Sequence, residues 1–521
     1  MKRALAALAL TLTACGGAVG KDQERVLHRR LEGAPETLNA LISTSDPENV
    51  VIALLQRNLL DYDEELNLVP GLAESVEAEP GHLVYTVKLR DGIRWEDGTP
   101  VSSDDVKATL EALLDPNTPA LYRRAFFADL EKVEAVDART ARVTFRKAYA
   151  CQRDAFNLPL LPARLYRGTE VATNPANRKP LATGPFRLAS WEGGTLRLVR
   201  NTQYFGEPPA FEQVVLRVVP ESAPAFQGLV TGDLDESRLN AVQRVELPKH
   251  PAIREVVYDE IAYTYLAWNN RLPQFSDPRV RRALTMLIDR EAIARTLYGG
   301  LAQPANGPLP PGLWAHDATL APLPYDPARA AALLDEAGWR KAKDGVRAKG
   351  GARLAFTVSF GSASDRQRQI LELAQRAFRE AGIEAALTPL EWGAFVEKVD
   401  AGDYEACSLS LNLDPNPDLR PNWHSSQVPP AGMNHAFYRN PRADALMDEI
   451  AATFDRGKAK ALYAELQRVI ADDQPFTFLH TVSVAWGVRD RVGNVRTSPV
   501  GLWLFWPGGA GWQPVRAAKP I

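Results

Sequence analysis

The chain is poor in cysteine and has no long apolar run. Only three cysteines occur in 521 residues, at positions 15, 151 and 407, which excludes a small scaffold held together by disulfides. The apolar run at residues 4–12 is far shorter than the roughly 20 residues that a membrane-spanning helix needs, and no later stretch approaches that length. The 61 basic and 64 acidic residues nearly balance, so the composition points to neither a nucleic-acid nor an anionic-lipid partner.

The motifs that usually carry catalysis or bind metals are also missing. None of the seven histidines belongs to a His-Glu-x-x-His pair, and no Gly-x-Ser-x-Gly elbow occurs. The turn at residues 361–364 begins Gly-Ser but lacks the second glycine of that elbow. Phosphate-binding loops and paired-cysteine metal motifs are absent as well. We therefore expect a protein that is not an enzyme and that has no cofactor and no metal site; a hydrolase is the main alternative from another functional class.

The N-terminus has the features of an export signal. Lys2 and Arg3 precede the apolar run, which ends in Leu-Thr-Ala-Cys at residues 12–15. This end resembles the bacterial lipobox, in which small residues precede a cysteine that becomes lipidated. We expect residues 1–14 to be a signal peptide, Cys15 to carry the lipid, and residues 15–25 to form a lipidated tether. The alternative is an ordinary secretory signal whose cysteine is incidental.

The remainder of the chain is long enough for two or three domains with substantial cores. Nothing in the spacing of Cys151 and Cys407 indicates a disulfide, so we expect two buried free thiols. Alternating patterns predict strands at residues 83–89, 195–200, 214–219 and 383–387. Helices are predicted at 103–113, from Pro327 to a stop at Gly338, at 370–381 and at 457–472. The fold class is therefore α/β or α+β with mixed sheets.

Six segments in a consistent order carry a resemblance to a known family. The second is the most specific: a strand, an Asp-Gly turn, a tryptophan at position 95 and a second Asp-Gly turn. The segments are residues 66–75, 85–100, 183–186, 200–206, 280–293 and 326–339. Together they resemble the family 5 extracellular solute-binding proteins, which include the dipeptide and oligopeptide binders. Most of these residues, such as Trp95, Gly98, Pro185 and Asp289, are expected to hold turns, sheets and caps rather than to touch a ligand.

The resemblance implies a periplasmic-binding-protein-like fold of type II, with two lobes, a hinge and an extra subdomain in the first lobe. The first lobe would comprise residues 26–65, 183–268 and 478–521. The subdomain would span 66–182, and the second lobe 269–477. The chain would cross between the lobes near Tyr265 and Asn269 and again near Pro475. A ligand would be enclosed between the lobes and released when the hinge opens.

The resemblance also implies where the ligand lies. The segment at residues 390–392 is similar to one that supplies an aromatic wall, although Trp392 fits an ordinary core position equally well. Peptide-binding members place an aspartate for the peptide's terminal amine in the segment that matches residues 409–418. An ungapped match puts Leu413 at that position, and in a strand its neighbour Asp414 would point to the opposite face. The expected ligand contacts are Tyr265, Trp392, Asn412, Asp414, Asp418, Trp423, His424 and Ser425, and a surface loop is the alternative for the last three.

The implied function is that of a receptor which captures peptides outside the cytoplasmic membrane and delivers them to the permease subunits of an ABC importer. We expect a monomer held by its lipid at the periplasmic or extracellular face of the cell envelope, without a nucleic-acid partner. The same receptor fold could instead carry an oligosaccharide, a nickel complex or haem. The 11 tryptophans would suit stacking on sugars but equally fill a core of this size. A transcription regulator with a solute-binding sensor is disfavoured because no DNA-binding segment precedes residue 20.

Overall fold

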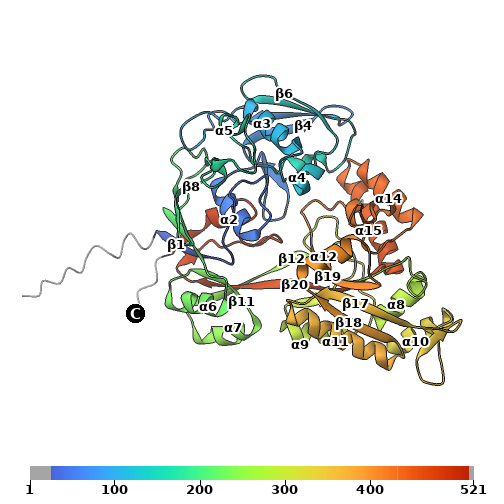
Figure 1. Cartoon of the computed structure of the whole chain (residues 1–521). Helices are drawn as coiled ribbons and strands as arrows, with labels where there is room; N and C mark the ends of the chain where they lie inside the picture. The colour runs from blue at the N-terminus through green and yellow to red at the C-terminus, as the bar shows by residue number, and fades with distance from the viewer. Residues whose placement is uncertain (1–24, 431, 516–521) are drawn as a thin grey trace, which may run out of the picture.

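A computed structural model describes residues 25–430 and 432–515. Its largest sheet has eleven strands in the order β18-β17-β19-β12-β20-β11-β1-β10-β9-β8, and β13 pairs with β20. In chain order these strands are β1 (Val26–Leu31), β8 (Phe186–Glu192), β9 (Thr195–Arg200), β10 (Gln213–Val218), β11 (Glu236–Leu239), β12 (Ile253–Trp268), β13 (Ala302–Pro304), β17 (Ala355–Gly361), β18 (Glu384–Leu390), β19 (Ala406–Asn412) and β20 (Phe476–Arg489). Figure 1 shows β12 and β20 running between two lobes.

The two long strands change partners where they pass between the lobes. Residues 253–259 of β12 pair with residues 483–489 of β20, whose residues 485–488 also pair with β11. Residues 262–268 of β12 pair with β19 on their other side. The register of β12 against β20 shifts between Asp259 and Tyr263, as it does at a β-bulge. The predicted boundary at 268/269 falls at the end of β12, several residues beyond this shift.

A separate four-stranded sheet extends the first lobe. Its order is β4-β5-β7-β6, formed by β4 (Ala73–Ala78), β5 (Val84–Leu89), β6 (Leu130–Ala135) and β7 (Thr140–Phe145). Trp95 is buried beneath it and its indole N–H donates to Asp105 over 3.4 Å. Asp105 also accepts from the backbone N–H of Ser102, which caps α3 (Ser103–Leu114). Gly98 has φ +86°, which a side chain would disfavour. The family-like segment 85–100 is therefore a structural turn, as expected.

The helices cover the sheets on both lobes. Those of the first lobe and its subdomain are α2 (Asp46–Leu55), α3, α4 (Leu121–Ala125), α5 (Ala163–Tyr166), α6 (Ser222–Thr231) and α7 (Ala241–Glu246). Those of the second lobe are α8 (Pro278–Met286), α9 (Arg290–Tyr298), α10 (Pro327–Glu336), α11 (Asp365–Glu380), α12 (Trp392–Asp400), α13 (Arg420–Trp423), α14 (Pro441–Ala451) and α15 (Arg456–Asp473).

The smaller elements complete the structure. Three further short sheets consist of β2 (Leu60–Tyr62) with β3 (Leu68–Pro70), β14 (Arg340–Lys341) with β15 (Arg347–Lys349) and β16 (Ala352–Arg353), and β21 (Val492–Gly493) with β22 (Gln513–Pro514). The mixed α/β class predicted from the sequence is confirmed, and the predicted helix at Pro327 begins there because Asp326 accepts from the Arg329 N–H. In the described residues no helix is long and apolar enough to cross a membrane.

The two cysteines that the structure describes are free. Cys407 is fully buried in β19, as predicted, whereas Cys151 is only half-buried. Cys15 and the predicted signal peptide lie outside the described residues.

Candidate ligand-binding cleft

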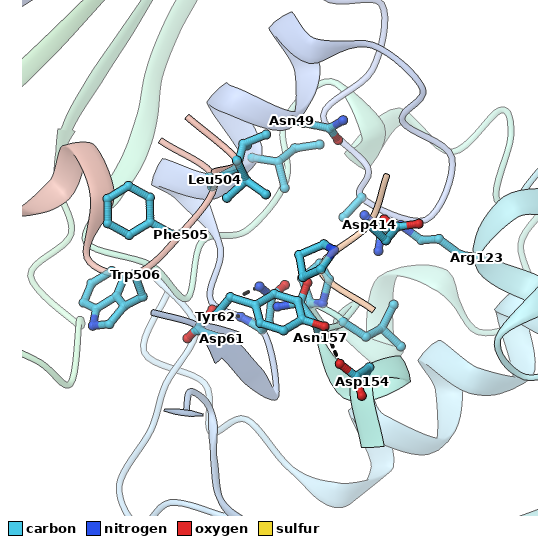
Figure 2. A pocket seen from close by; sticks show the side chains of 18 of the residues that line it. Asn49, Asp61, Tyr62, Arg123, Asp154, Asn157, Asp414, Leu504, Phe505 and Trp506 are labelled. Carbon is cyan, nitrogen blue, oxygen red and sulfur yellow. Dashed lines mark hydrogen bonds between the residues drawn. The ribbon is translucent and has the colours of Figure 1, made fainter. Parts of the chain in front are cut away.

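A cavity of about 390 Å³ lies between the lobes (Figure 2). The first lobe and its subdomain contribute α2, residues 56–62 and two segments near residues 123–127 and 154–159. The second lobe contributes the loop 413–416, which follows β19, and the C-terminal segment contributes residues 500–506. The volume falls at the lower end of the roughly 300–1,000 Å³ that ligand pockets occupy.

One face of α2 forms part of the wall. Asn49, Ile52 and Ala53 line the cavity, followed by Gln56 just past the helix end. Their spacing of three, four and seven residues places them on one side of a helix. Ser45 caps this helix in a reciprocal pair with Glu48, whose carboxylate also accepts from the backbone N–H groups of Glu36 and Thr37. The cap fixes the direction of α2 and thereby the position of the wall.

On the first-lobe side, two pairs of polar side chains are hydrogen-bonded within each pair. Arg57 donates from Nε to Asp61 over 2.7 Å, and its guanidinium lies 3.4 Å from the ring centroid of Trp506. Tyr62 donates its hydroxyl to Asp154 over 2.7 Å. Burial raises the pKa of Tyr62 and that of Asp154. These hydrogen bonds hold the four side chains in place, because none of them can turn to a ligand without losing a charge-assisted hydrogen bond.

Asp414 reaches the cavity from the second lobe. β19 ends at Asn412, and the Leu413 N–H donates to the Ile261 carbonyl over 2.8 Å. Asp414 therefore belongs to a loop, where strict strand alternation no longer decides which way a side chain points. Its carboxylate is exposed to the cleft yet enclosed by protein on most sides, and burial raises its pKa to about 6.

Arg123 lines the same cavity from α4. Within the described part of the chain, its guanidinium has no hydrogen bond or ion pair. Burial lowers its pKa. Its neighbour Arg124 differs, because that guanidinium donates to the carbonyls of Leu113, Asp115 and Thr118. Arg124 therefore holds the local backbone, whereas Arg123 presents an unsatisfied cation to the cavity.

Three further buried polar atoms at the wall lack a partner among the described residues. They are Oε1 of Gln56, Nδ2 of Asn416 and Nε1 of Trp503. The three side chains are 6%, 8% and 5% exposed. Buried polar groups in native proteins are usually hydrogen-bonded. One acceptor and two donors, on three residues that line the cavity from different segments, are therefore left for water or a polar solute to satisfy.

A second cavity of about 470 Å³ adjoins the first on the side of β12. The two cavities share Asp46, Leu413, Val500, Trp503 and Leu504 as lining residues. The second also contacts Tyr258, Glu260 and Asn412, together with Trp486 of β20. Because β12 and β20 connect the lobes, a solute that extends into this cavity would touch the connecting strands directly.

The structure brings only two of the eight predicted ligand contacts to these cavities: Asp414 lines the first and Asn412 the second. Tyr265 is buried and stacked on Phe476, with 4.0 Å between ring centroids. Trp423 is fully buried beside the same phenylalanine. Their roles as ligand contacts stay predictions, although both rings lie in the core of the second lobe.

The other four predicted contacts lie outside the two cavities. Trp392 is the first residue of α12 and is 59% exposed, which does not match the core alternative. Ser425 donates from its N–H and hydroxyl to Asp444, and His424 lies within 4.0 Å of the same carboxylate. Asp418 accepts from the Arg420 N–H at the start of α13. These contacts are structural in the conformation described, and ligand binding by these residues stays a prediction.

The sequence did not predict four residues that line the first cavity: Gln56, Arg123, Asn416 and Trp503. The helical spacing of Asn49 and Gln56, with apolar residues between them, was a usable signal for a polar helix face. No local pattern marks Arg123 or Trp503, because they meet only when α4 and the C-terminal segment fold against the cleft.

Comparison with known proteins assigns the chain to a family. Residues 67–432 match the model of the bacterial extracellular solute-binding proteins, family 5. The oligopeptide-binding protein AppA of Bacillus subtilis (strain 168) is 30% identical over 507 residues, covering 92% of each chain. The glutathione-binding protein GsiB of Escherichia coli (strain K12) is 27% identical over 459 residues, covering 84% of this chain and 86% of GsiB.

Solved structures agree with this assignment. AppA from Bacillus subtilis in complex with a nonapeptide superimposes with a TM-score of 0.76 at 27% identity, covering 94% of this chain and 99% of AppA. NikZ from Campylobacter jejuni in complex with Ni(L-His) gives a TM-score of 0.78 at 25% identity, with coverage of 94% and 99%. The two-lobed fold is thus shared along nearly the whole chain. This protein belongs to the bacterial extracellular solute-binding proteins of family 5.

Proposed function

We propose that this protein captures a peptide in the cleft between its lobes and presents it to an ABC importer. The observation that carries the proposal is the composition of the cavity wall. The acceptor on Gln56 and the donors on Asn416 and Trp503 match the N–H and C=O groups of a peptide backbone. Asp414 supplies a carboxylate for an ammonium group. The names of AppA and GsiB, an oligopeptide binder and a glutathione binder, support the same class of solute.

The path of the chain supports motion of the lobes about β12 and β20. We keep the predicted division into lobe one (26–65, 183–268 and 478–521), its subdomain (66–182) and lobe two (269–477). The shift in pairing at residues 259–263 of β12 is the natural point of bending, because the ladder is already interrupted there. Opening at this point would expose the solute to the permease.

The proposed location is the outer face of the cell envelope. The membership of an extracellular family supports export, and the Leu-Thr-Ala-Cys sequence at residues 12–15 supports a lipid anchor on Cys15. We propose a monomer that meets the permease subunits from this anchored position and acts as a receptor, without turnover of its solute.

The test combines two measurements on the full-length exported protein. Native mass spectrometry of the protein as purified would detect a retained solute, and calorimetric titration with peptide mixtures would measure affinity. Stoichiometric binding of peptide without cleavage is the expected result. Retention of a sugar, a haem or a nickel complex, together with no measurable peptide binding, would overturn the peptide assignment. Release of cleaved peptide would overturn the receptor assignment.

A further inference from the structure

The first lobe contains an ion pair that is completely buried. Arg29 of β1 and Glu236 of β11 are register partners in the large sheet, and Nε of Arg29 donates to the Glu236 carboxylate over 2.9 Å. The two side chains are 3% and 0% exposed. Burial lowers the pKa of Arg29 to about 10, so this side chain stays a cation at neutral pH. Stability alone does not account for such a pair, because two apolar side chains of similar volume often stabilise a core equally well.

The cation of this pair contacts a ring at the cleft. The guanidinium carbon of Arg29 lies 3.6 Å from the ring centroid of Trp503. Trp512 packs against the same indole, with 4.5 Å between ring centroids. A side-chain carbon at Gly509 would lie only 1.8 Å from the indole, so glycine is needed there. A cation over an aromatic face is attracted to it, most strongly where both are shielded from water. Arg29 therefore fixes which way the face of this indole points.

The neighbouring Trp506 is held in the same manner. Arg57 lies 3.4 Å from its ring centroid and donates to Asp61 over 2.7 Å. Both tryptophans belong to the segment 500–506, which lines the first cavity. Two buried arginines, each paired with a carboxylate of the first lobe, thus hold this segment in place.

Trp503 lies between the two cavities of the cleft, because it lines both of them. It forms a partition with the other residues that the cavities share: Asp46, Leu413, Val500 and Leu504. The volumes of about 390 and 470 Å³ each fall in the lower half of the range of ligand pockets, whereas the two joined would come near its upper end. The position of this one ring therefore affects how long a solute the cleft can enclose.

From these contacts we infer that Arg29 and Glu236 are positioning residues, which hold the indole of Trp503 as a partition and so restrict the cleft to short peptides. The inference rests on the proposed function and adds the size class of the solute. Glu236 acts on Arg29, and Arg29 acts on the ring. A buried pair of charges suits this role, because the attraction of a cation to an aromatic ring depends on which face the ring presents.

The test measures the preference for peptide length in the double variant Arg29→Met/Glu236→Met. Both residues are replaced because either change alone would leave a buried charge without its partner. The double variant should melt at a temperature as high as the unaltered protein does. It should nevertheless bind hexapeptides, relative to dipeptides, about tenfold better than the unaltered protein does. Native mass spectrometry with an equimolar mixture of di- to octapeptides gives this ratio, and calorimetric titration with single peptides checks it.

Two further variants show whether the effect passes through the indole. Trp503→Ala removes the partition directly and should shift the preference in the same direction. Added to the double variant, it should cause no further shift, because both changes act on one ring. Arg29→Lys keeps the charge but loses the planar guanidinium, so it should shift the preference part of the way. This single change also carries the test if the double variant does not fold.

A matched control removes a buried arginine elsewhere. The side chain of Arg347 is also 3% exposed and is paired with Asp335 over 2.5 Å in the second lobe, and neither residue lines the two cavities. Arg347→Met/Asp335→Met should therefore change stability without changing the length preference.

A readout without peptide tests the positioning by itself. The indole N–H resonance of Trp503, identified by its loss in Trp503→Phe, should shift and broaden in the double variant as the ring takes more than one orientation. It should stay the same in the control.

The outcomes separate this inference from the proposed function. An unaltered protein that prefers the longest peptides, or a double variant that keeps the original preference, would overturn the restriction by the partition. An indole resonance that is the same in the double variant would overturn the positioning role of Arg29 and Glu236. If no peptide binds the unaltered protein, the proposed function fails and the size restriction fails with it, whereas the indole resonance still decides the positioning.

Discussion

The imidazole of His82 stacks on the ring of Phe454, with 3.6 Å between ring centroids and 10° between planes. His82 lies in the turn between β4 and β5, and Phe454 lies between α14 and α15, so the contact joins the subdomain to the second lobe. Beside it the Ala150 N–H donates to the Ala451 carbonyl over 2.8 Å. Figure 1 shows α14 near the subdomain, at a distance from β12 and β20.

Phe454→Ala should shift the protein toward its open form. An aromatic pair contributes about 0.5–1.5 kcal/mol beyond its buried area, so the affinity for peptide should fall by about two- to tenfold. Small-angle scattering should show a larger radius of gyration without ligand and compaction when ligand is added. Val242→Ala, at an exposed valine of α7, is the control. An unaltered protein whose radius of gyration stays the same on saturation with a verified ligand would contradict a hinged trap.

Asp414→Ala should nearly abolish binding of peptides with a free amino terminus. Leaving a buried ammonium without its carboxylate typically costs about 3–5 kcal/mol, which corresponds to several hundred-fold or more in affinity. Peptides with an acetylated amino terminus should lose much less, because they carry no charge there. Calorimetric titration of both peptide forms, with a melting curve beside it, makes the comparison. Equal losses for both forms would show that Asp414 only supports its loop.

Binding should weaken in acid because of Asp414. Burial raises its pKa from 3.8 to about 6, so the carboxyl becomes neutral as the pH falls through 6, and a neutral carboxyl cannot pair with an ammonium. The affinity should be constant above about pH 7 and should fall by up to tenfold for each pH unit below 6. Asp414→Asn should bind more weakly and show a flatter pH profile. Asp154 also has a raised pKa, so Asp154→Asn is measured alongside; if it alone removes the pH dependence, the assignment to Asp414 is wrong.

Trp423→Ala should affect stability. The indole is fully buried, with its ring 4.6 Å from Phe476 and 5.8 Å from Phe478. Emptying such a position typically lowers the free energy of unfolding by about 3–5 kcal/mol, and Trp423→Phe should cost less. Denaturant titration measures this loss. A variant of unchanged stability that no longer binds peptide would instead place Trp423 among the ligand contacts.

Cys15→Ser should give a soluble exported protein or an unprocessed precursor, since no thiol remains to accept a lipid. Mass spectrometry of the N-terminal peptide and membrane fractionation check this directly. Cys151→Ser leaves the predicted lipid attachment intact and should fractionate with membranes. A Cys15→Ser protein that is still lipidated would refute the lipobox interpretation.

Local signals in the sequence predicted much of the fold. The cap at Asp326, the strand at residues 195–200 and the Asp-Gly turns near Trp95 depend on neighbours within a few positions, and each forms as expected. The cleft was harder to predict. Gln56, Arg123, Asn416 and Trp503 come from four distant segments, and only Gln56, through its helical spacing from Asn49, has a local signal in the sequence. Trp392 differs in another way: it is exposed, which does not match the core alternative, and it lies outside both cavities, so its role as a ligand contact stays a prediction.

The place of β20 in the large sheet has a consequence for how the protein is made. This strand comes late in the chain, yet it lies between β12 and β11 in the middle of the sheet. Until residues 476–489 have been synthesised, the strands of the two lobes have no common partner to join them. Sheets that depend on such distant pairings form slowly. The two lobes can therefore be joined through the large sheet only after most of the chain has been synthesised.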